Sequence, residues 1–162
     1  MKSELIRDFV RGCRLDEYLF WDDELGLMPR EYYGYSKRIR CEHTLVFDVV
    51  ERAQGRVAGE VALRIGDSPE QFYLGHIGYH IDPPFRGHGY AARACRLAAP
   101  VFGALGYRFA VITTDPDNQP SVKTCLRLCC ELESTVRVPP WVKEKLDISD
   151  VKHRFLWTVP NG

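Results

Sequence analysis

Two glycines one residue apart, directly after an arginine, form the most chemically suggestive feature of the sequence. The run Arg86-Gly87-His88-Gly89 follows Pro83-Pro84 and precedes an alanine-rich stretch that begins at Tyr90. Glycine lets a backbone pass close to a ligand because it has no Cβ. At a helix start, unpaired N–H groups and the positive end of the helix dipole bind phosphate. The pattern therefore predicts a phosphate-binding turn, with a tight structural turn as the alternative.

Two other phosphate-binding turns do not fit this run. A P-loop requires Gly-Lys-Ser/Thr, and a dinucleotide fingerprint requires a third glycine at the position of Ala92. The strands expected ahead of the turn are consecutive and antiparallel, which also argues against a doubly wound fold. The run therefore calls for a different class of anion site.

The elements that must position this turn follow from the hydrophobic pattern. Residues 45–50 and 57–65 are β-rich and are joined by a hairpin turn at 53–55, and a third strand is expected over 72–81. Short helices are expected within 14–40, and an alanine-rich helix follows the glycine turn, with Pro100 expected to kink or shorten it. The remaining elements are a strand over 107–114, a helix after Asp117-Asn118, and closing strands over 131–138 and 154–159.

This order predicts an α/β (α+β) fold. It is a three-layer domain with a mixed central sheet of about six or seven strands and helices on both faces. The chain of 162 residues suits a single domain. We divide residues 1–162 into acceptor-side helices (1–40), a cofactor-binding core (44–138), and a loop with a closing strand (139–162).

The stretch from Gly75 to Ala91 resembles the core of the GNAT acetyltransferases, in which a strand leads to Arg/Gln-x-x-Gly-x-Gly/Ala. Arg86, Gly89 and Ala91 occupy those three positions. The later run Asp117-Asn118-Gln119-Pro120-Ser121 resembles the second motif of the family, Asn-x-x-Ser/Ala at the start of a helix. The resemblance covers about residues 44–138 and is closest to a little-studied bacterial branch of predicted acetyltransferases with an Ile-Gly-Tyr strand.

The resemblance implies that acetyl-CoA binds in a V-shaped splay between the strand ending at Ile81 and the strand ending near Thr114. The backbone of Tyr79, His80 and Ile81 would pair with the pantetheine arm. The pyrophosphate would be held by Arg86, Gly87, His88, Gly89, Tyr90 and Ala91. Asn118 and Ser121 would lie beside the pantetheine and the acyl group.

The implied reaction is direct attack of an amine on the thioester in a ternary complex, with a backbone N–H on the strand 79–81 stabilising the oxyanion. A general base would remove a proton from the amine. Strand alternation places His76 and His80 on one face and Tyr79 on the other. His80, His76 and Glu60 are the candidate bases, and a hydrogen-bonded structural histidine or a surface carboxylate is the alternative for each.

One position departs from the family pattern. Many relatives carry a tyrosine seven residues beyond the motif asparagine, as the acid that protonates the departing CoA, and here that position is Cys125. Cys125 also belongs to the apolar stripe of its predicted helix, so we interpret it as a packing residue, with a covalent acyl-cysteine route as the alternative.

The acceptor side is expected in an aromatic and acidic cluster near the N-terminus, whose carboxylates could attract a cationic amine. The alternative is that the acidic residues favour a helix N-terminus and the aromatic rings pack on the sheet. The cluster consists of Tyr18, Trp21, Asp22, Asp23, Glu24, Tyr32, Tyr33 and Tyr35. The acceptor would be a small-molecule amine or an amine of a peptide or protein.

Composition limits the other partners. Lys plus Arg and Asp plus Glu number 22 each, so no basic excess favours nucleic acid or an anionic membrane. We expect a cytoplasmic location, because no apolar stretch suits a signal or a membrane span. A zinc set of Cys125, Cys129, Cys130 and His153 matches no known spacing, so no metal is expected. A homodimer remains open, as does the alternative of a non-catalytic CoA-binding sensor or interaction module.

Overall fold

The computed structural model describes residues 2–15 and 20–160, which form five α-helices, one 3-10 helix and seven strands. The helices are α1 (Lys2–Gly12), α2 (Pro69–Leu74), η1 (Pro83–Phe85), α3 (Tyr90–Ala104), α4 (Gln119–Arg127) and α5 (Pro140–Leu146). The strands are β1 (Leu25–Tyr33), β2 (His43–Glu51), β3 (Arg56–Ile65), β4 (Ile77–Ile81), β5 (Phe109–Thr114), β6 (Glu131–Arg137) and β7 (Val151–Thr158). Among these residues no helix is both long and apolar enough to cross a membrane.

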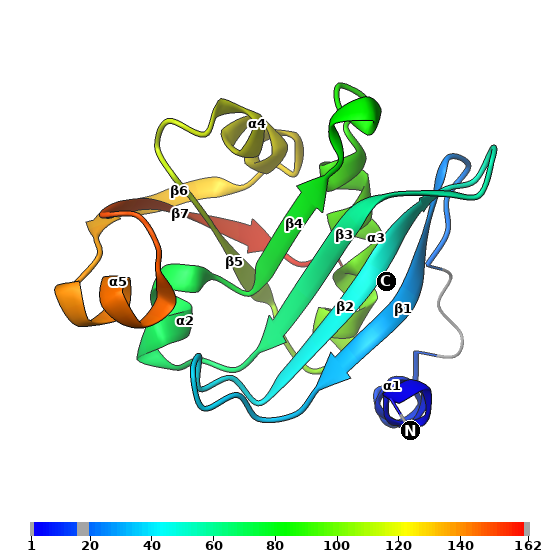
Figure 1. The fold of residues 1–162 in the computed structure, drawn as a ribbon, viewed down its shortest axis with the longest axis horizontal. Helices are drawn as coiled ribbons and strands as arrows, with labels where there is room; N and C mark the ends of the chain where they lie inside the picture. The colour runs from blue at the N-terminus through cyan, green and yellow to red at the C-terminus, as the bar shows by residue number, and fades with distance from the viewer. Residues whose placement is uncertain (1, 16–19, 161–162) are drawn as a thin grey trace.

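The strands form two antiparallel sheets, where the sequence predicted one mixed sheet. The first sheet has the order β1-β2-β3-β4 and the second the order β5-β7-β6. The α/β fold class and the expected hairpin at 53–55 are confirmed, but the seven strands are divided between sheets of four and three. The two sheets meet between β4 and β5 and then diverge, which gives the V-shaped splay visible in Figure 1.

His76 joins the two sheets at the base of the splay. Its backbone N–H donates to Val111 O (2.7 Å), and Val111 N–H donates to His76 Nδ1 (2.9 Å). Because Nδ1 accepts a hydrogen bond, the ring proton of a neutral imidazole lies on Nε2, which donates to Gly66 O (3.1 Å). The residue is 8% exposed. Both ring nitrogens therefore make hydrogen bonds within the fold.

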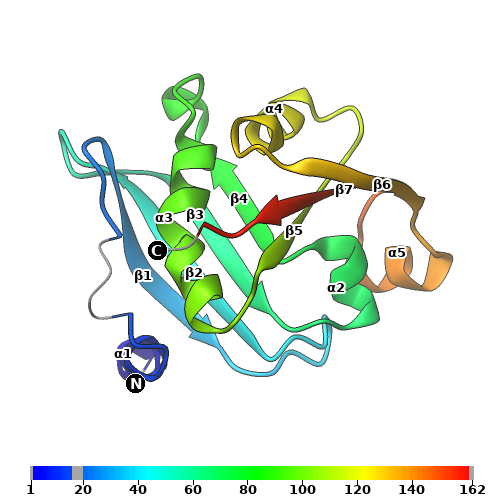
Figure 2. The ribbon, with the colours of Figure 1, turned by 180° about the vertical axis from the view of Figure 1, so that it is seen from behind.

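One helix covers the inner face of the four-stranded sheet. Figure 2 shows α3 packed across β1–β4, with α1 beside the lower end of β1. Small residues of α3, including Ala94 and Ala98, are fully buried and allow a close approach to Phe47 and Val61 of the sheet. Pro100 lies inside α3, which nevertheless continues to Ala104. The opposite face of this sheet is turned toward the viewer in Figure 1, and no described helix crosses it there.

Two predicted elements have a different structure. Residues 72–74, expected as the start of a strand, lie in α2, whose first turn is capped by Ser68 Oγ accepting from Gln71 N (3.2 Å). Glu70 is 1% exposed and pairs with Arg40 (2.9 Å) and Lys145 (2.7 Å). These distant partners stabilise a helix that the β-rich local sequence did not indicate.

The second difference lies near the N-terminus. Leu25–Tyr33 is a strand paired with β2, and the described residues 20–40 contain no helix. Residues 16–19, part of the segment in which short helices were expected, lie outside the described residues. Leu25 and Leu27 are completely buried on the core face, and this burial decides the structure of a segment whose apolar spacing was ambiguous. The irregular segment expected after Pro139 likewise contains α5.

Replacing His76 with leucine should lower the free energy of unfolding by about 2 to 4 kcal/mol, because Val111 N–H and Gly66 O would be buried without partners. Urea unfolding followed by circular dichroism measures the effect. The matched control is His153→Leu on the partly exposed strand β7, where we expect a loss below about 1 kcal/mol. Equal losses in the two variants would contradict the role of His76 as the joint.

Candidate functional site

The glycine turn lies between η1 and α3 and has the geometry of an anion cradle. Gly87 and Gly89 have φ values of 86° and 72°, in the left-handed region that favours glycine. A Cβ added to Gly87 would meet nothing within 4 Å. The first α-helical bond of α3 runs from Arg93 N to Gly89 O (3.2 Å), so the earlier amides of the first turn have no helical acceptor.

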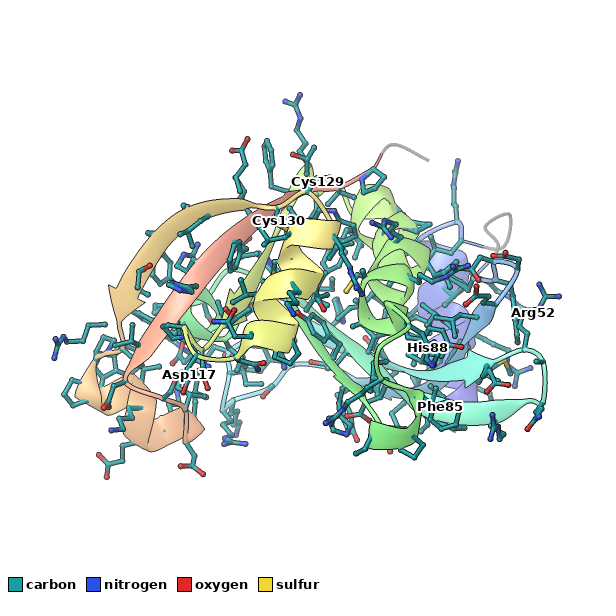
Figure 3. The ribbon with its side chains drawn as sticks, turned by 90° about the horizontal axis from the view of Figure 1, so that it is seen from above. Arg52, Phe85, His88, Asp117, Cys129 and Cys130 are labelled. Carbon is teal, nitrogen blue, oxygen red and sulfur yellow. The ribbon has the colours of Figure 1, made fainter. Side chains whose placement is uncertain are left out.

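Two arginines flank this turn. Arg86 is exposed, and its Nε donates to Ile81 O (2.7 Å), which leaves the outer nitrogens of the guanidinium available. Arg127, at the end of α4, reaches the other side: a Cβ on Gly89 would lie 3.0 Å from its Nη1. Figure 3 shows α3 and α4 side by side, with His88 in the turn before α3. The sequence analysis missed Arg127, because its proximity depends on how the two helices pack.

Beyond His76, the edge of β4 that faces the splay has no partner strand among the described residues, and Arg86 Nε bonds Ile81 O at its far end. Asp82 N bonds Ala58 O (2.8 Å) and Arg64 N bonds His76 O (2.7 Å), so the even-numbered residues of β4 face β3. By alternation, the N–H and C=O groups of Tyr79 and Ile81 point into the splay. Within the part of the chain that the structure describes, β3 is the only strand that pairs with β4.

The second sequence motif meets β4 through one tyrosine. Asn118 caps α4, and its Oδ1 accepts from Ser121 N (3.3 Å). The hydroxyl of Tyr79 lies 2.7 Å from Ser121 Oγ and 3.4 Å from Ser121 O. The ring of Tyr79 therefore bridges β4 to the helix that follows β5. Burial, together with the neighbouring Cys125 thiol, raises the pKa of Tyr79 above its usual range despite the hydrogen bond from Ser121.

The three candidate bases have different surroundings. The ring of His76 is bonded to Val111 N–H and Gly66 O, so neither of its nitrogens is available to a substrate amine. His80 is exposed, with 58% of its side chain accessible, and its Nε2 lies 3.4 Å from Asp82 Oδ1. Glu60 is the cross-strand neighbour of His80, and its Oε2 accepts from Arg30 Nη2 (2.5 Å).

The acidic residues expected to attract an acceptor are engaged by Arg93 of α3. Its guanidinium lies 3.0 Å from Asp22, 2.5 Å from Asp23 and 3.6 Å from Glu24. Partial burial raises the pKa of Asp22, but hydrogen bonds from Arg93 and from the amides of Leu25 and Glu24 outweigh it, so this pKa lies below its usual value. These carboxylates therefore hold the chain before β1 against α3.

The aromatic residues of the same cluster are dispersed. The Trp21 ring packs on Gly26, Tyr32 bonds His43 Nδ1 (2.7 Å), and Tyr33 bonds Glu31. Tyr35 lines a surface hollow of 670 Å³ near Tyr107, and Asp23 and Glu24 line a second hollow of 590 Å³ with Arg52 and Tyr90. Tyr18 lies outside the described residues. The structure does not gather the remaining residues into one acceptor wall.

The four residues considered and set aside as a zinc set have separate surroundings. Cys125 and Cys130 are buried, Cys129 is exposed at the other end of α4 from Asp117, and His153 Nδ1 is bonded to Thr135 Oγ1 (2.7 Å). Among residues 2–15 and 20–160, no group of three or more His, Cys, Asp or Glu side chains is placed to hold a metal ion.

Comparison with known families and proteins gives two sequence matches. The model of the Acetyltransferase (GNAT) domain matches residues 17–130, well over half of the chain. The chain is also 33% identical over 108 residues to the DNA mismatch repair protein MutL of Methanothrix thermoacetophila. That match covers 61% of this chain and 18% of the MutL protein.

Solved structures share the fold. The ribosomal-protein-S5-alanine acetyltransferase from Vibrio fischeri has a TM-score of 0.56 at 19% identity, covering 73% of this chain and 63% of its own. The microcin C7 self-immunity acetyltransferase MccE, in complex with acetyl-CoA and AMP, has a TM-score of 0.56 at 22% identity. The match covers 72% of this chain and 61% of the MccE chain. The present chain thus spans less than two-thirds of the length of either protein.

Replacing Gly89 with valine should weaken CoA binding at least tenfold, because the branched side chain would enter the cradle and displace Arg127. The matched control is Gly55→Val in the β2–β3 turn, which has a similar φ of 66° and open space around it. Both variants should lose about 1 to 2 kcal/mol of stability from the left-handed backbone. Calorimetric titration with CoA separates them: equal affinity in folded Gly89→Val and Gly55→Val proteins would contradict the assignment of the cradle.

Proposed function

The chain belongs to the GNAT acetyltransferase family, and we propose that it transfers an acetyl group from acetyl-CoA to an amine by direct attack in a ternary complex. The observation that carries this proposal is the edge of β4 at Tyr79 and Ile81, which has no partner strand among the described residues and leads through η1 to the glycine turn. An extended ligand with a phosphate at one end matches this arrangement of backbone groups.

The residues present fit CoA by their chemistry. The open space over Gly87 admits the pyrophosphate, the free amides of the first turn of α3 donate to it, and Arg86 and Arg127 supply positive charge on either side. The amide and carbonyl of Tyr79 can pair with the amides of a pantetheine arm, as an added strand would. MccE, in complex with acetyl-CoA, has the same fold, which supports this choice of cofactor.

Acetyl-CoA supplies the activated acyl group as a thioester. A backbone N–H that points into the splay, from Tyr79 or Ile81, can donate to the carbonyl oxygen as negative charge develops on it. The donor is fixed by the pairing of β4 with β3, so little reorganisation is required when the charge forms. The strand therefore both orients the acyl group and stabilises the oxyanion.

His80 is the base that we propose for the attacking amine. Its side chain lies on the face of β4 opposite α3, whereas Tyr79 faces α3 and α4. Its imidazole is accessible, and the weak contact with Asp82 (3.4 Å) leaves it able to accept a proton. Glu60 is less suitable, because its Oε2 is already bonded to Arg30.

We propose that the acceptor approaches over the exposed face of the four-stranded sheet. A cross-strand row on this face runs from Met28 through Asp48 and Glu60 to His80. Arg30 bonds both carboxylates of this row, Asp48 at 2.6 Å and Glu60 at 2.5 Å, so their negative charge is already in part balanced and the row offers a polar face beside His80. The acceptor that we propose is an amine carried by a small molecule, a peptide or a protein. The Vibrio fischeri neighbour, by its name, acts on an alanine of a ribosomal protein. We also propose that the enzyme is cytoplasmic and that it can form a homodimer.

One observation favours a second candidate function. Cys125 stands where the family resemblance implied an acid, and its side chain is completely buried. A protein without a group to assist the departing thiolate could act as a CoA-binding sensor. Turnover distinguishes the two functions, because a sensor would bind acetyl-CoA and transfer nothing.

The proposed function predicts saturable binding of acetyl-CoA and CoA in calorimetric titrations, with none for NADH. In the presence of a polyamine or a peptide with a free N-terminus, an acetylated product should form. Mass spectrometry should detect it, because a thiol reagent would also label the exposed Cys129. Binding without product across the acceptor panel would favour the sensor, and no binding of either CoA species would overturn both functions.

Replacing His80 with glutamine should lower kcat about 100-fold and leave the affinity for acetyl-CoA within about twofold, because the side chain faces the acceptor and not the cofactor. The variant should recover part of its rate as pH rises, since more of the amine is then already neutral. His153→Gln on β7 is the control for loss of a histidine elsewhere. An unchanged kcat would exclude His80 and make Glu60→Gln the next variant to measure.

A further inference from the structure

A hydroxyl group between β4 and α4 has no part in the reaction described above. Tyr79 extends from β4 across the opening between the two sheets, and its Oη lies 2.7 Å from Ser121 Oγ in the first turn of α4. Cys95 of α3 and Cys125 of α4 lie beside the phenol and are completely buried. The ring therefore forms one side of the splay at the level of the free β4 edge.

We propose that Tyr79 is the hydrogen-bond donor that stabilises the thiolate leaving the acyl carbon. The inference rests on the proposed function, because it requires a thioester bound along the β4 edge. A ligand that pairs with the backbone of Tyr79 lies within reach of the side chain of the same residue. Cys125 stands where an acid was expected, and the Tyr79 hydroxyl from β4 would take over the role of that acid.

The step balances without an additional reactant. The amine nitrogen forms a C–N bond to the acyl carbon, and its surplus proton passes to His80. The C–S bond breaks, and its electron pair leaves on sulfur as a thiolate. The Tyr79 O–H group donates a hydrogen bond to that sulfur and keeps its own proton, and the thiolate takes a proton from solvent after release.

Two properties of the site suit this role. Burial raises the pKa of Tyr79 above its usual range, so the phenol remains protonated at physiological pH and is available as a donor. The hydrogen bond that the Tyr79 hydroxyl donates to Ser121 O is long (3.4 Å), and Ser121 Oγ can itself donate to Tyr79 Oη (2.7 Å), so a ligand sulfur can take the phenolic hydrogen in exchange for the long bond. A hydrogen bond to a developing anion inside a partly dry site is stronger than one between neutral groups.

The alternative is that Tyr79 only ties β4 to α4. A purely structural tyrosine would affect the stability and the cofactor affinity, but it would not distinguish ligands by their sulfur atom. This difference makes a binding experiment possible that does not depend on catalysis. Desulfo-CoA, which lacks the sulfur, is the matched ligand.

The test uses the full chain as wild type, Tyr79→Phe and Cys125→Ala. We expect Tyr79→Phe to lower kcat about 100-fold at unchanged KM for acetyl-CoA. In calorimetry the wild type should bind CoA several-fold more tightly than desulfo-CoA, and Tyr79→Phe should remove that preference. Cys125→Ala, which removes the neighbouring thiol, should keep both kcat and the preference within about threefold of wild type.

Three outcomes would overturn the inference: an unchanged kcat in Tyr79→Phe, an equal loss of affinity for both ligands, or a loss of the preference in Cys125→Ala. Thermal unfolding of each variant shows whether a lost activity reflects a lost fold. Failure of the proposed function gives a different result, because wild-type protein would then bind no CoA or form no product.

Discussion

The contact between His76 and Val111 is the constraint on which the site depends. A hydrogen bond from His76 N–H to Val111 O and one from Val111 N–H to His76 Nδ1 link the residue before β4 to β5. The other ring nitrogen, Nε2, bonds Gly66 O. Beyond this joint the strands diverge, so the inner edge of β4 is left without a partner strand. An unpaired edge is normally a liability, because it invites another chain to pair with it. Here the same edge is recessed within a splay and can take an extended ligand.

The short strand β4 then separates the two halves of the proposed chemistry. Consecutive side chains of a strand lie on opposite faces, so Tyr79 faces α3 and α4 while His80 faces the exposed side of the sheet. Backbone groups alternate as well, and those of Tyr79 point into the splay. A proton acceptor for the amine and a donor for the departing sulfur can therefore be supplied by two adjacent residues, on opposite sides of the acyl group, without any mobile element.

Features that depend on neighbouring residues could be predicted from the sequence, whereas features that depend on contacts between distant segments could not. The glycine turn and the start of a helix after Asn118 were predicted correctly, because each depends on a few neighbouring residues with strong conformational preferences. The helix α2 was missed, because the ion pairs of Glu70 come from distant segments. Arg127 was missed for the same reason: its place beside Gly89 is set by the packing of α3 on α4.

The charges around α3 explain how a chain with no net charge can present an anion site. Carboxylates near a helix N-terminus stabilise the helix, but unpaired ones would repel a phosphate at the same end. Asp22, Asp23 and Glu24 lie within reach of the first turns of α3, yet Arg93 neutralises much of their charge. The helix dipole, Arg86 and Arg127 are thus left to act on the glycine turn. Selectivity for an anion depends here on which charges are already paired, and the overall charge of the protein gives no indication of it.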